Sequence, residues 1–210
     1  MPRFFVERIT HPAVLSPEES RHAVRVLRLG PGDPVTVFDP TETWTGEIVS
    51  VEDRVTVRLI EKRTRPALRP LVVAAAVPKG ARLDWMVEKL AELGVAELVP
   101  VRFARSVAEA GDGKRRRLEK IALAAAKQSG APVMRISAER PLEAVPADAV
   151  LADPEAPQPL DPGAGWVVIG PEGGLTETER RRFARLGRLG GTTLRIETAA
   201  VVAAARILAP

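Results

Sequence analysis

The stretch VVIGPEGGLTETE, residues Val167–Glu179, combines residue types that could hold a small molecule. Glycines on both sides of a proline and a glutamate leave room for a ligand to reach main-chain N–H and C=O groups. The apolar residues before them are typical of a buried strand, and Thr176 and Glu179 have the spacing of a helix capping box. Ligands of parallel sheets bind beyond the carboxyl ends of strands, so a binding loop is expected at Ile169–Gly174.

The charge of this loop indicates which ligand it would take. Glu172 would repel a phosphate group, no lysine follows the glycines, and the spacing fits neither the dinucleotide-binding fingerprint nor the P-loop. A neutral or cationic ligand is therefore expected rather than a phosphate at a helix start. The alternative is a tight strand-to-helix turn with an exposed glutamate, because isolated glycine motifs also occur in ordinary turns.

A second glycine-bearing segment, LGGTTLRIETAA, spans Leu189–Ala200. Its pattern predicts a buried strand over Thr192–Glu197, with Arg195 and Glu197 on one face because side chains alternate along a strand. Charges on a buried strand are costly unless they are paired or functional. The structural alternative to a functional role is an ion pair of Arg195 with Glu197 or with Glu172.

The N-terminal part of the chain has the pattern of a small β-domain. Alternation with a two-residue period predicts strands, at Asp33–Asp39, Thr45–Val51 and Arg54–Lys62. Ser16 followed by Pro17 predicts the start of a helix over Pro17–Leu27. These elements indicate a mostly antiparallel barrel over residues 1–66. The segment TRPALRP, Thr64–Pro70, has two prolines and no apolar period, and we place the domain boundary there.

After Pro70 the pattern becomes that of an α/β domain over residues 70–210. Continuous apolar runs predict buried strands, at Leu71–Val77, Ala96–Val101, Ala149–Asp153 and Gly165–Gly170. Helical periodicity predicts the segments between and after them, at Leu83–Leu93, at Gly113–Ser129, from Glu177 onward and at Thr198–Leu208. Alternating strands and helices imply a parallel sheet with helices on both faces.

Composition limits the remaining chemistry. The chain has 210 residues, of which 45% are apolar and 28% charged, as in globular proteins. Its net charge is +4 and most basic residues are arginine, which makes a nucleic-acid partner plausible. Because there is no cysteine and only two histidines, we expect neither disulfides nor a metal site. No signal peptide or transmembrane run is recognisable, so a cytoplasmic protein is expected.

Together, the segments IGPEGGLTETE and LGGTTLRIETAA resemble the ribosomal RNA small-subunit methyltransferase E family, part of the knotted SPOUT superfamily. The resemblance extends to RHAVRVLRLGPGD, Arg21–Asp33, and to VEKLAELGVAELVPV, Val87–Val101, and so covers nearly the whole chain. It implies methylation at N3 of a uridine in 16S ribosomal RNA, S-adenosylmethionine as cofactor, and a homodimer. It also implies a PUA-like N-terminal barrel and a C-terminal trefoil knot, which no periodicity predicts.

Two other functions stay open. One keeps the cofactor but changes the substrate to transfer RNA or another ribosomal site. The other is a non-catalytic RNA-binding or ribosome-assembly protein, although two intact glycine segments argue against it.

The resemblance assigns the glycine segments to the cofactor. The implied cofactor-binding set is Ile169, Gly170, Pro171, Glu172, Gly173, Gly174, Leu189, Gly190, Gly191, Leu194 and Arg195. Its sulfonium is cationic and it has no phosphate, which fits a carboxylate in the loop. Arg195 is the candidate for stabilising negative charge on the uracil oxygens. Glu172, Glu197 or a carboxylate of the partner subunit are candidates for the general base, and capping or dimer packing is the alternative for Glu197.

RNA contacts are expected in the N-terminal domain. Most of its candidates share one face of the predicted helix, with Val24 and Leu27 packing inward. These candidates are Arg21, His22, Arg25 and Arg28, and Arg3 and Arg8 extend the patch. A solvated basic face is the alternative, as it is for the run GKRRRLEK at Gly113–Lys120. Lys79 and Arg82, after the first strand of the α/β domain, are expected on the cofactor side.

The chain departs from the family in one loop. Members usually carry EQSGR, whereas this sequence has AKQSGAPVMR at Ala126–Arg135, with Ala131 in place of the arginine. Arg135 would substitute only if the loop folds back toward the site.

Overall fold

The computed structural model describes residues 1–64 and 69–208, and the chain divides into two compact units, Met1–Ala67 and Leu68–Pro210. The linker expected at Thr64–Pro70 includes residues 65–68, which lie outside the described residues. No helix among the described residues is long and apolar enough to cross a membrane.

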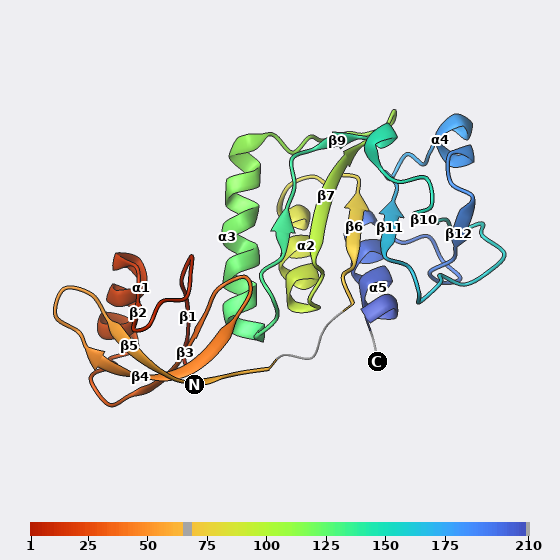
Figure 1. The fold of residues 1–210 in the computed structure, drawn as a ribbon. Coiled ribbons are helices and arrows are strands. Elements are labelled where there is room, and N and C mark those ends of the chain that lie inside the picture. The colour runs from red at the N-terminus through yellow and green to blue at the C-terminus, as the bar shows by residue number, and fades with distance from the viewer. Residues whose placement is uncertain (65–68, 209–210) are drawn as a thin grey trace. The chain divides into compact units, whose positions relative to one another are not determined.

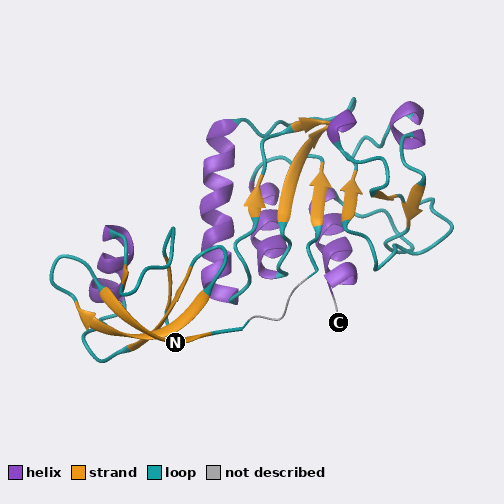
Figure 2. Ribbon diagram, in the orientation of Figure 1, coloured by secondary structure: helices purple, strands orange, loops and turns teal. Residues whose placement is uncertain are grey.

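The N-terminal unit is built on a five-stranded sheet in the order β1-β3-β4-β5-β2 (Figure 2). Its strands are β1 (Arg3–Phe5), β2 (Ala13–Val14), β3 (Pro34–Phe38), β4 (Thr43–Ser50) and β5 (Thr56–Lys62). β1 runs parallel to β3, and the other pairings are antiparallel, as expected. Alternating side chains of the strands supply a separate apolar core that includes Phe4, Val35, Val37, Ile48 and Val57.

The predicted helix forms, but its second half is not an α-helix. Ser16 Oγ accepts a hydrogen bond from the N–H of Glu19 and starts α1 (Pro17–Arg21), and a π-helix, η1, follows at His22–Val26. The wider π turn, in which the N–H of Leu27 bonds to the carbonyl of His22, rotates the later side chains away from α-helical positions.

The inward packing expected for Val24 and Leu27 is therefore wrong. Both side chains are exposed, together with Val26, and Ala23 is the buried residue of this turn. The α-helical spacing used to place the arginines on one face does not hold past Arg21.

The C-terminal unit contains a parallel sheet in the order β12-β10-β11-β6-β7-β8, with β9 (Arg140–Pro141) paired to the end of β7 (Figure 1). The strands are β6 (Val72–Ala75), β7 (Glu97–Arg102), β8 (Arg135–Ile136), β10 (Val150–Ala152), β11 (Trp166–Ile169) and β12 (Arg185–Gly187). Every pairing along this order is parallel, which confirms the α/β prediction.

The long helices of this unit are α2 (Ala81–Glu92), α3 (Asp112–Ser129) and α5 (Ile196–Leu208); η2 (Leu142–Ala144) and α4 (Glu177–Arg181) are short. α2 ends before Gly94 and α3 before Gly130, and both glycines have the left-handed φ that favours glycine at a helix end. α2 packs against α3 and α5, and α2 and α5 lie behind the strands in Figure 1.

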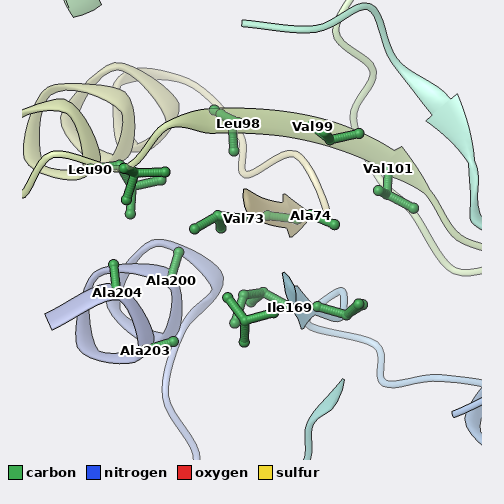
Figure 3. Close-up of a cluster of buried hydrophobic side chains, with 14 of the residues drawn as sticks. Val73, Ala74, Leu90, Leu98, Val99, Val101, Ile169, Ala200, Ala203 and Ala204 are labelled. Carbon is green, nitrogen blue, oxygen red and sulfur yellow. The ribbon is translucent and has the colours of Figure 1, made fainter. Parts of the chain in front are cut away.

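The core of this unit joins the central strands to α2 and α5 (Figure 3). Val73 of β6 and Leu98 of β7 face Leu90 of α2, and α5 contributes the small side chains Ala200 and Ala203. Because these alanines add little bulk, α5 can lie close to the sheet.

The strand predicted at Thr192–Glu197 is absent. Residues 192–195 belong to no strand or helix, and α5 begins at Ile196, where the N–H of Ala199 bonds to the carbonyl of Arg195. The alternating Thr and Leu residues resemble a strand, but the alanine-rich run that follows extends its helix back to Ile196. The edge strand is β12, so the argument that placed Arg195 and Glu197 on one strand face fails.

The order of the strands reverses next to β6. The chain continues from β6 through β7 to β8 on one side, and β11, β10 and β12 lie on the other. In open α/β sheets, ligands bind outside the carboxyl ends of the strands near such a reversal.

Candidate functional site

A cavity of about 170 Å³ lies beyond the carboxyl ends of β10 and β11. A water molecule needs roughly 10–15 Å³ of such space, so the cavity can take a sizeable organic group. Three segments line it: the end of β10, the loop after β11, and the segment leading into α5. The lining residues are Ala152, Asp153, Pro154, Ile169, Gly170, Pro171, Glu172, Gly174, Leu175, Leu189, Gly190, Thr192, Thr193, Leu194, Ile196 and Ala199.

The loop after β11 is a tight turn whose shape depends on its glycines. The N–H of Gly174 donates to the carbonyl of Pro171 at 2.9 Å. Gly174 has a φ of 71°, a backbone angle that residues with a side chain rarely adopt. A Cβ at Gly170 would lie 2.4 Å from Leu175 Cδ1. α4 follows with the predicted capping box of Thr176 and Glu179, so this part of the sequence prediction is confirmed.

The segment before α5 forms the opposite wall. Leu189, Leu194 and Ile196 supply apolar surface, and Thr192 and Thr193 supply hydroxyl groups. A Cβ built at Gly190 would meet no heavy atom within 4 Å, so the glycine there leaves open space beside the cavity.

Sequence reasoning missed the wall from β10. Asp153 follows the last residue of β10 and lines the cavity, and its Oδ2 accepts a 2.6 Å hydrogen bond from Arg180 Nε. The signal was available, because AVLAD ends in Asp153 at the carboxyl end of a predicted strand. The rule that singled out the end of β11 applies equally to its neighbour β10.

The charged residues that line the cavity are both acidic. Glu172 Oε1 accepts a 2.8 Å hydrogen bond from Arg82 Nη1 at the start of α2, so Arg82 does reach this side of the sheet, as expected. The ion pair suggested between Arg195 and Glu172 is not formed. Among the described residues, no lysine or arginine lines the cavity, which agrees with the expectation of a neutral or cationic ligand rather than a phosphate.

Arg195 and Glu197 lie beside the cavity without lining it. Arg195 stands between the lining residues Leu194 and Ile196; its side chain is exposed and has no hydrogen-bond or ion-pair partner among the described residues. Glu197 is buried, with 7% of its surface exposed, and its Oε2 has no partner within the described part of the chain. The suggested Arg195–Glu197 ion pair is also absent.

Most of the residues predicted for cofactor binding meet at this cavity. Those that line it are Ile169, Gly170, Pro171, Glu172, Gly174, Leu189, Gly190 and Leu194. Gly173, Gly191 and Arg195 do not belong to the lining. A Cβ at Gly173 would instead point to Arg105, at 3.4 Å from its Cβ.

The predicted RNA-binding residues lie on the N-terminal unit. Arg21, His22, Arg25 and Arg28 are exposed. His22 also makes an edge contact with Phe4, with ring centroids 6.5 Å apart, and Arg3 places its guanidinium 4.7 Å from the centre of the Phe38 ring. These two side chains therefore have packing contacts within the unit itself.

The loop with Ala131 lies at the other edge of the sheet from the cavity. Arg135 begins β8, pairs with the first residue of β7, Glu97, and forms an ion pair with the Glu97 carboxylate. Because the strands are parallel, this pair marks their amino ends, so Arg135 does not fold back to the cavity.

Among the described residues, no group of three His, Asp or Glu side chains could hold a metal ion.

Family models match both parts of the chain. An RNA methyltransferase domain matches residues 65–208, and an RNA methyltransferase PUA domain matches residues 15–60. The chain is 31% identical to ribosomal RNA small subunit methyltransferase E of Bacillus subtilis, over 99% of this chain and 96% of that protein.

Solved structures agree with this match. One is a ribosomal RNA small subunit methyltransferase E from Neisseria gonorrhoeae bound to S-adenosylmethionine, with TM-score 0.84 and 25% identity over 98% of this chain and 95% of that one. Another is a putative methyltransferase from Legionella pneumophila in complex with the same cofactor, with TM-score 0.80 and 26% identity over 98% and 96%. With its α/β sheet and its PUA-type N-terminal unit, the chain belongs to the ribosomal RNA small subunit methyltransferase E family.

Proposed function

We propose that the protein transfers the methyl group of S-adenosylmethionine to small-subunit ribosomal RNA, at N3 of a uridine in the 16S molecule. The observation that carries the proposal is the cavity formed by the two glycine-bearing segments at the strand ends of the unit that matches the RNA methyltransferase domain. The relatives named for this activity, and the solved relatives that hold the cofactor, support it. The N3 position rests on the family resemblance.

The lining fits the chemistry of this cofactor. Ile169, Leu189 and Leu194 offer apolar surface for an adenine ring, and main-chain groups near Gly170 and Gly190 are accessible for its polar edge. Two carboxylates and no basic side chain among the described lining residues suit a cationic sulfonium. When bound, the cofactor supplies an electrophilic methyl group.

The residues near the cavity would orient the uracil and handle its charge. Loss of the N3 proton leaves negative charge on the ring oxygens. Arg195, which is exposed and has no side-chain partner among the described residues, is the proposed donor that stabilises it. Glu172 lines the cavity and is the better candidate for a general base. Glu197 lies outside the lining, and its buried Oε2, which has no partner among the described residues, favours a role in packing against a second copy of the chain.

The remaining parts of the proposal concern partners. The exposed arginines Arg21, Arg25 and Arg28 would contact phosphates of the ribosomal RNA, with His22 and Arg3 beside them. We further propose a homodimer, a trefoil knot in the C-terminal unit, and a cytoplasmic location with the ribosome. Size-exclusion chromatography with light scattering would measure the number of copies.

The deciding experiment incubates small ribosomal subunits with labelled S-adenosylmethionine and maps the modified base. Label at N3 of one uridine of the 16S molecule is the expected result. Parallel reactions with naked ribosomal RNA and with transfer RNA separate this function from the alternative substrates. Absence of label in every RNA, with normal cofactor binding, would favour a non-catalytic RNA-binding protein.

A further inference from the structure

A short turn after β7, Phe103–Ser106, touches the glycine-bearing loop Gly170–Leu175 without belonging to the cavity lining. Within the turn, Ser106 Oγ accepts a hydrogen bond from the N–H of Phe103 at 2.9 Å, and the N–H of Ser106 donates to the carbonyl of Phe103 at 3.1 Å. These two bonds close the turn on itself. The turn is therefore a defined structure that can support a neighbouring loop.

Arg105 of this turn binds the main chain of the loop. Its Nη1 donates a 2.9 Å hydrogen bond to the carbonyl oxygen of Gly173. A Cβ at Gly173 would lie 3.4 Å from the Cβ of Arg105 and 3.8 Å from its carbonyl oxygen. Gly173 thus faces the turn, and an added Cβ there would be in ordinary van der Waals contact with Arg105.

A second link joins the same two segments. Glu179 Oε1 accepts a hydrogen bond from the N–H of Ala104 at 2.7 Å, and Oε2 accepts one from the N–H of Thr176, also at 2.7 Å. Burial raises the pKa of Glu179, but these main-chain donors outweigh burial, and the pKa is held below its usual value. The carboxylate is therefore ionised at neutral pH and ties the turn to the residue that follows the loop.

We propose that Arg105 is a positioning residue: by holding the carbonyl of Gly173, it keeps Gly170–Leu175 in the shape that lines the cofactor cavity. A loop fixed before binding loses less conformational freedom when the ligand arrives, so affinity is higher. This inference rests on the proposed function, because the affinity for S-adenosylmethionine is what would change when the loop loses its shape.

The test compares Arg105→Ala, Arg105→Lys and the control Arg181→Ala. Arg181 is an exposed cation on α4 that pairs with Glu177, and among the described residues its side chain has no hydrogen-bond or ion-pair partner in the loop. Two measurements are made without RNA: the Kd for S-adenosylmethionine by calorimetry, and hydrogen exchange at the N–H of Gly174, which bonds to Pro171. Melting temperatures confirm folding, since 1 kcal/mol shifts Tm by about 2–4 °C for a chain of this size.

We expect Arg105→Ala to raise the Kd about five- to tenfold, the effect of losing one charged hydrogen bond at a partly exposed site. Exchange at Gly174 becomes faster in the same variant. Arg105→Lys retains a donor and should restore most of both properties, and Arg181→Ala should match the wild type.

Wild-type Kd and exchange in Arg105→Ala would overturn the proposal. It would also be overturned by a defect seen only in the affinity for ribosomal subunits, because Arg105 would then act through RNA. If the wild-type protein binds no S-adenosylmethionine, the proposed function fails, while the exchange measurement still decides whether Arg105 holds the loop.

Discussion

Arg82 and Glu172, ninety residues apart in the chain, meet in an ion pair whose Nη1 and Oε1 atoms are 2.8 Å apart. Arg82 lies in the first turn of α2, the helix after β6, and Glu172 belongs to the loop after β11. The pair therefore joins segments that follow two adjacent strands. It also gives a carboxylate of the cavity wall a fixed cationic neighbour, which restrains its position.

The ion pair should contribute little to stability. Both side chains are more than one third exposed, so solvent screens their attraction, and a coupling energy of about 0.2–1 kcal/mol is expected. A double-mutant cycle of Arg82→Ala and Glu172→Ala in urea unfolding measures it. A coupling above about 2 kcal/mol would show that the pair is less solvated than its exposure indicates.

Gly190→Val should block the cavity without disturbing the fold. A Cβ at Gly190 would meet no atom within 4 Å, so we expect the unit to accommodate a larger residue. The position lines the cavity, however, and the branched side chain takes space needed by the ligand. We expect at least about a tenfold loss of cofactor affinity, or 1.4 kcal/mol, with an unchanged melting temperature.

Gly191→Val is the matched control for this prediction. Gly191 is the next residue, also meets no atom within 4 Å when a Cβ is added, and is absent from the lining. Equal loss of affinity in both variants would mean that any bulky residue in this segment weakens cofactor binding.

Gly173→Val, by contrast, should act through Arg105, because Gly173 faces that residue.

Arg195→Ala should leave the fold intact and remove most of the turnover. The side chain is exposed and bonds to none of the described residues, so its loss costs the folded state little. If it stabilises charge on the uracil oxygens, kcat should fall by about 10²–10³. Single-turnover assays on small subunits measure this, and undiminished kcat would remove Arg195 from the mechanism.

Stability should decrease in acid partly through Glu179. The pKa of its carboxyl is lowered by the N–H donors of Ala104 and Thr176 despite partial burial, so the folded state binds a proton less readily than the unfolded chain. The resulting stability is fully present above the unfolded pKa, about 4.3, and is lost as pH falls through the lower folded pKa.

Unfolding in urea between pH 6 and pH 3 tests this contribution, with Glu179→Gln as the comparison. The Gln variant should be less stable at neutral pH and should lose less stability on acidification, because it has no carboxyl to protonate at this position. Parallel pH curves for the two proteins would assign the acid sensitivity to other groups, such as Asp39, whose pKa is also lowered.

The two glycine segments line one cavity, as the family resemblance implied. From local signals alone, the strand end and the glycines after it predicted a binding loop only at Ile169–Gly174, with an ordinary turn as the alternative. Asp153 has the same strand-end signal, but its place in the same cavity as the loop after β11 follows from the adjacency of β10 and β11, which is a property of the strand order. β12 has only three residues, and Leu186 is its one large apolar side chain, so no period marks it. Thr192–Glu197 has the residue types of a strand, but its last two residues belong to α5 and the four before them form no regular element.

The prediction of an α-helix over Pro17–Leu27 was wrong in its second half, for a different reason. Its start at Ser16 is a local capping signal and was predicted correctly, whereas the turn at His22–Val26 is closed by the wider hydrogen bonding of a π-helix. As a result Ala23 is buried and Val24 is exposed, a pattern that the helical periodicity of the sequence does not predict.

The late position of α5 in the chain has a consequence for synthesis. β6 is made before its neighbour β11, and the helix that packs on both strands, α5, is made after all strands of the sheet. A nascent polypeptide lacking its last segment would have neither the wall at Ile196 and Ala199 nor the cover of its central strands. The C-terminal unit therefore cannot finish folding, or recognise a ligand, until α5 has been synthesised.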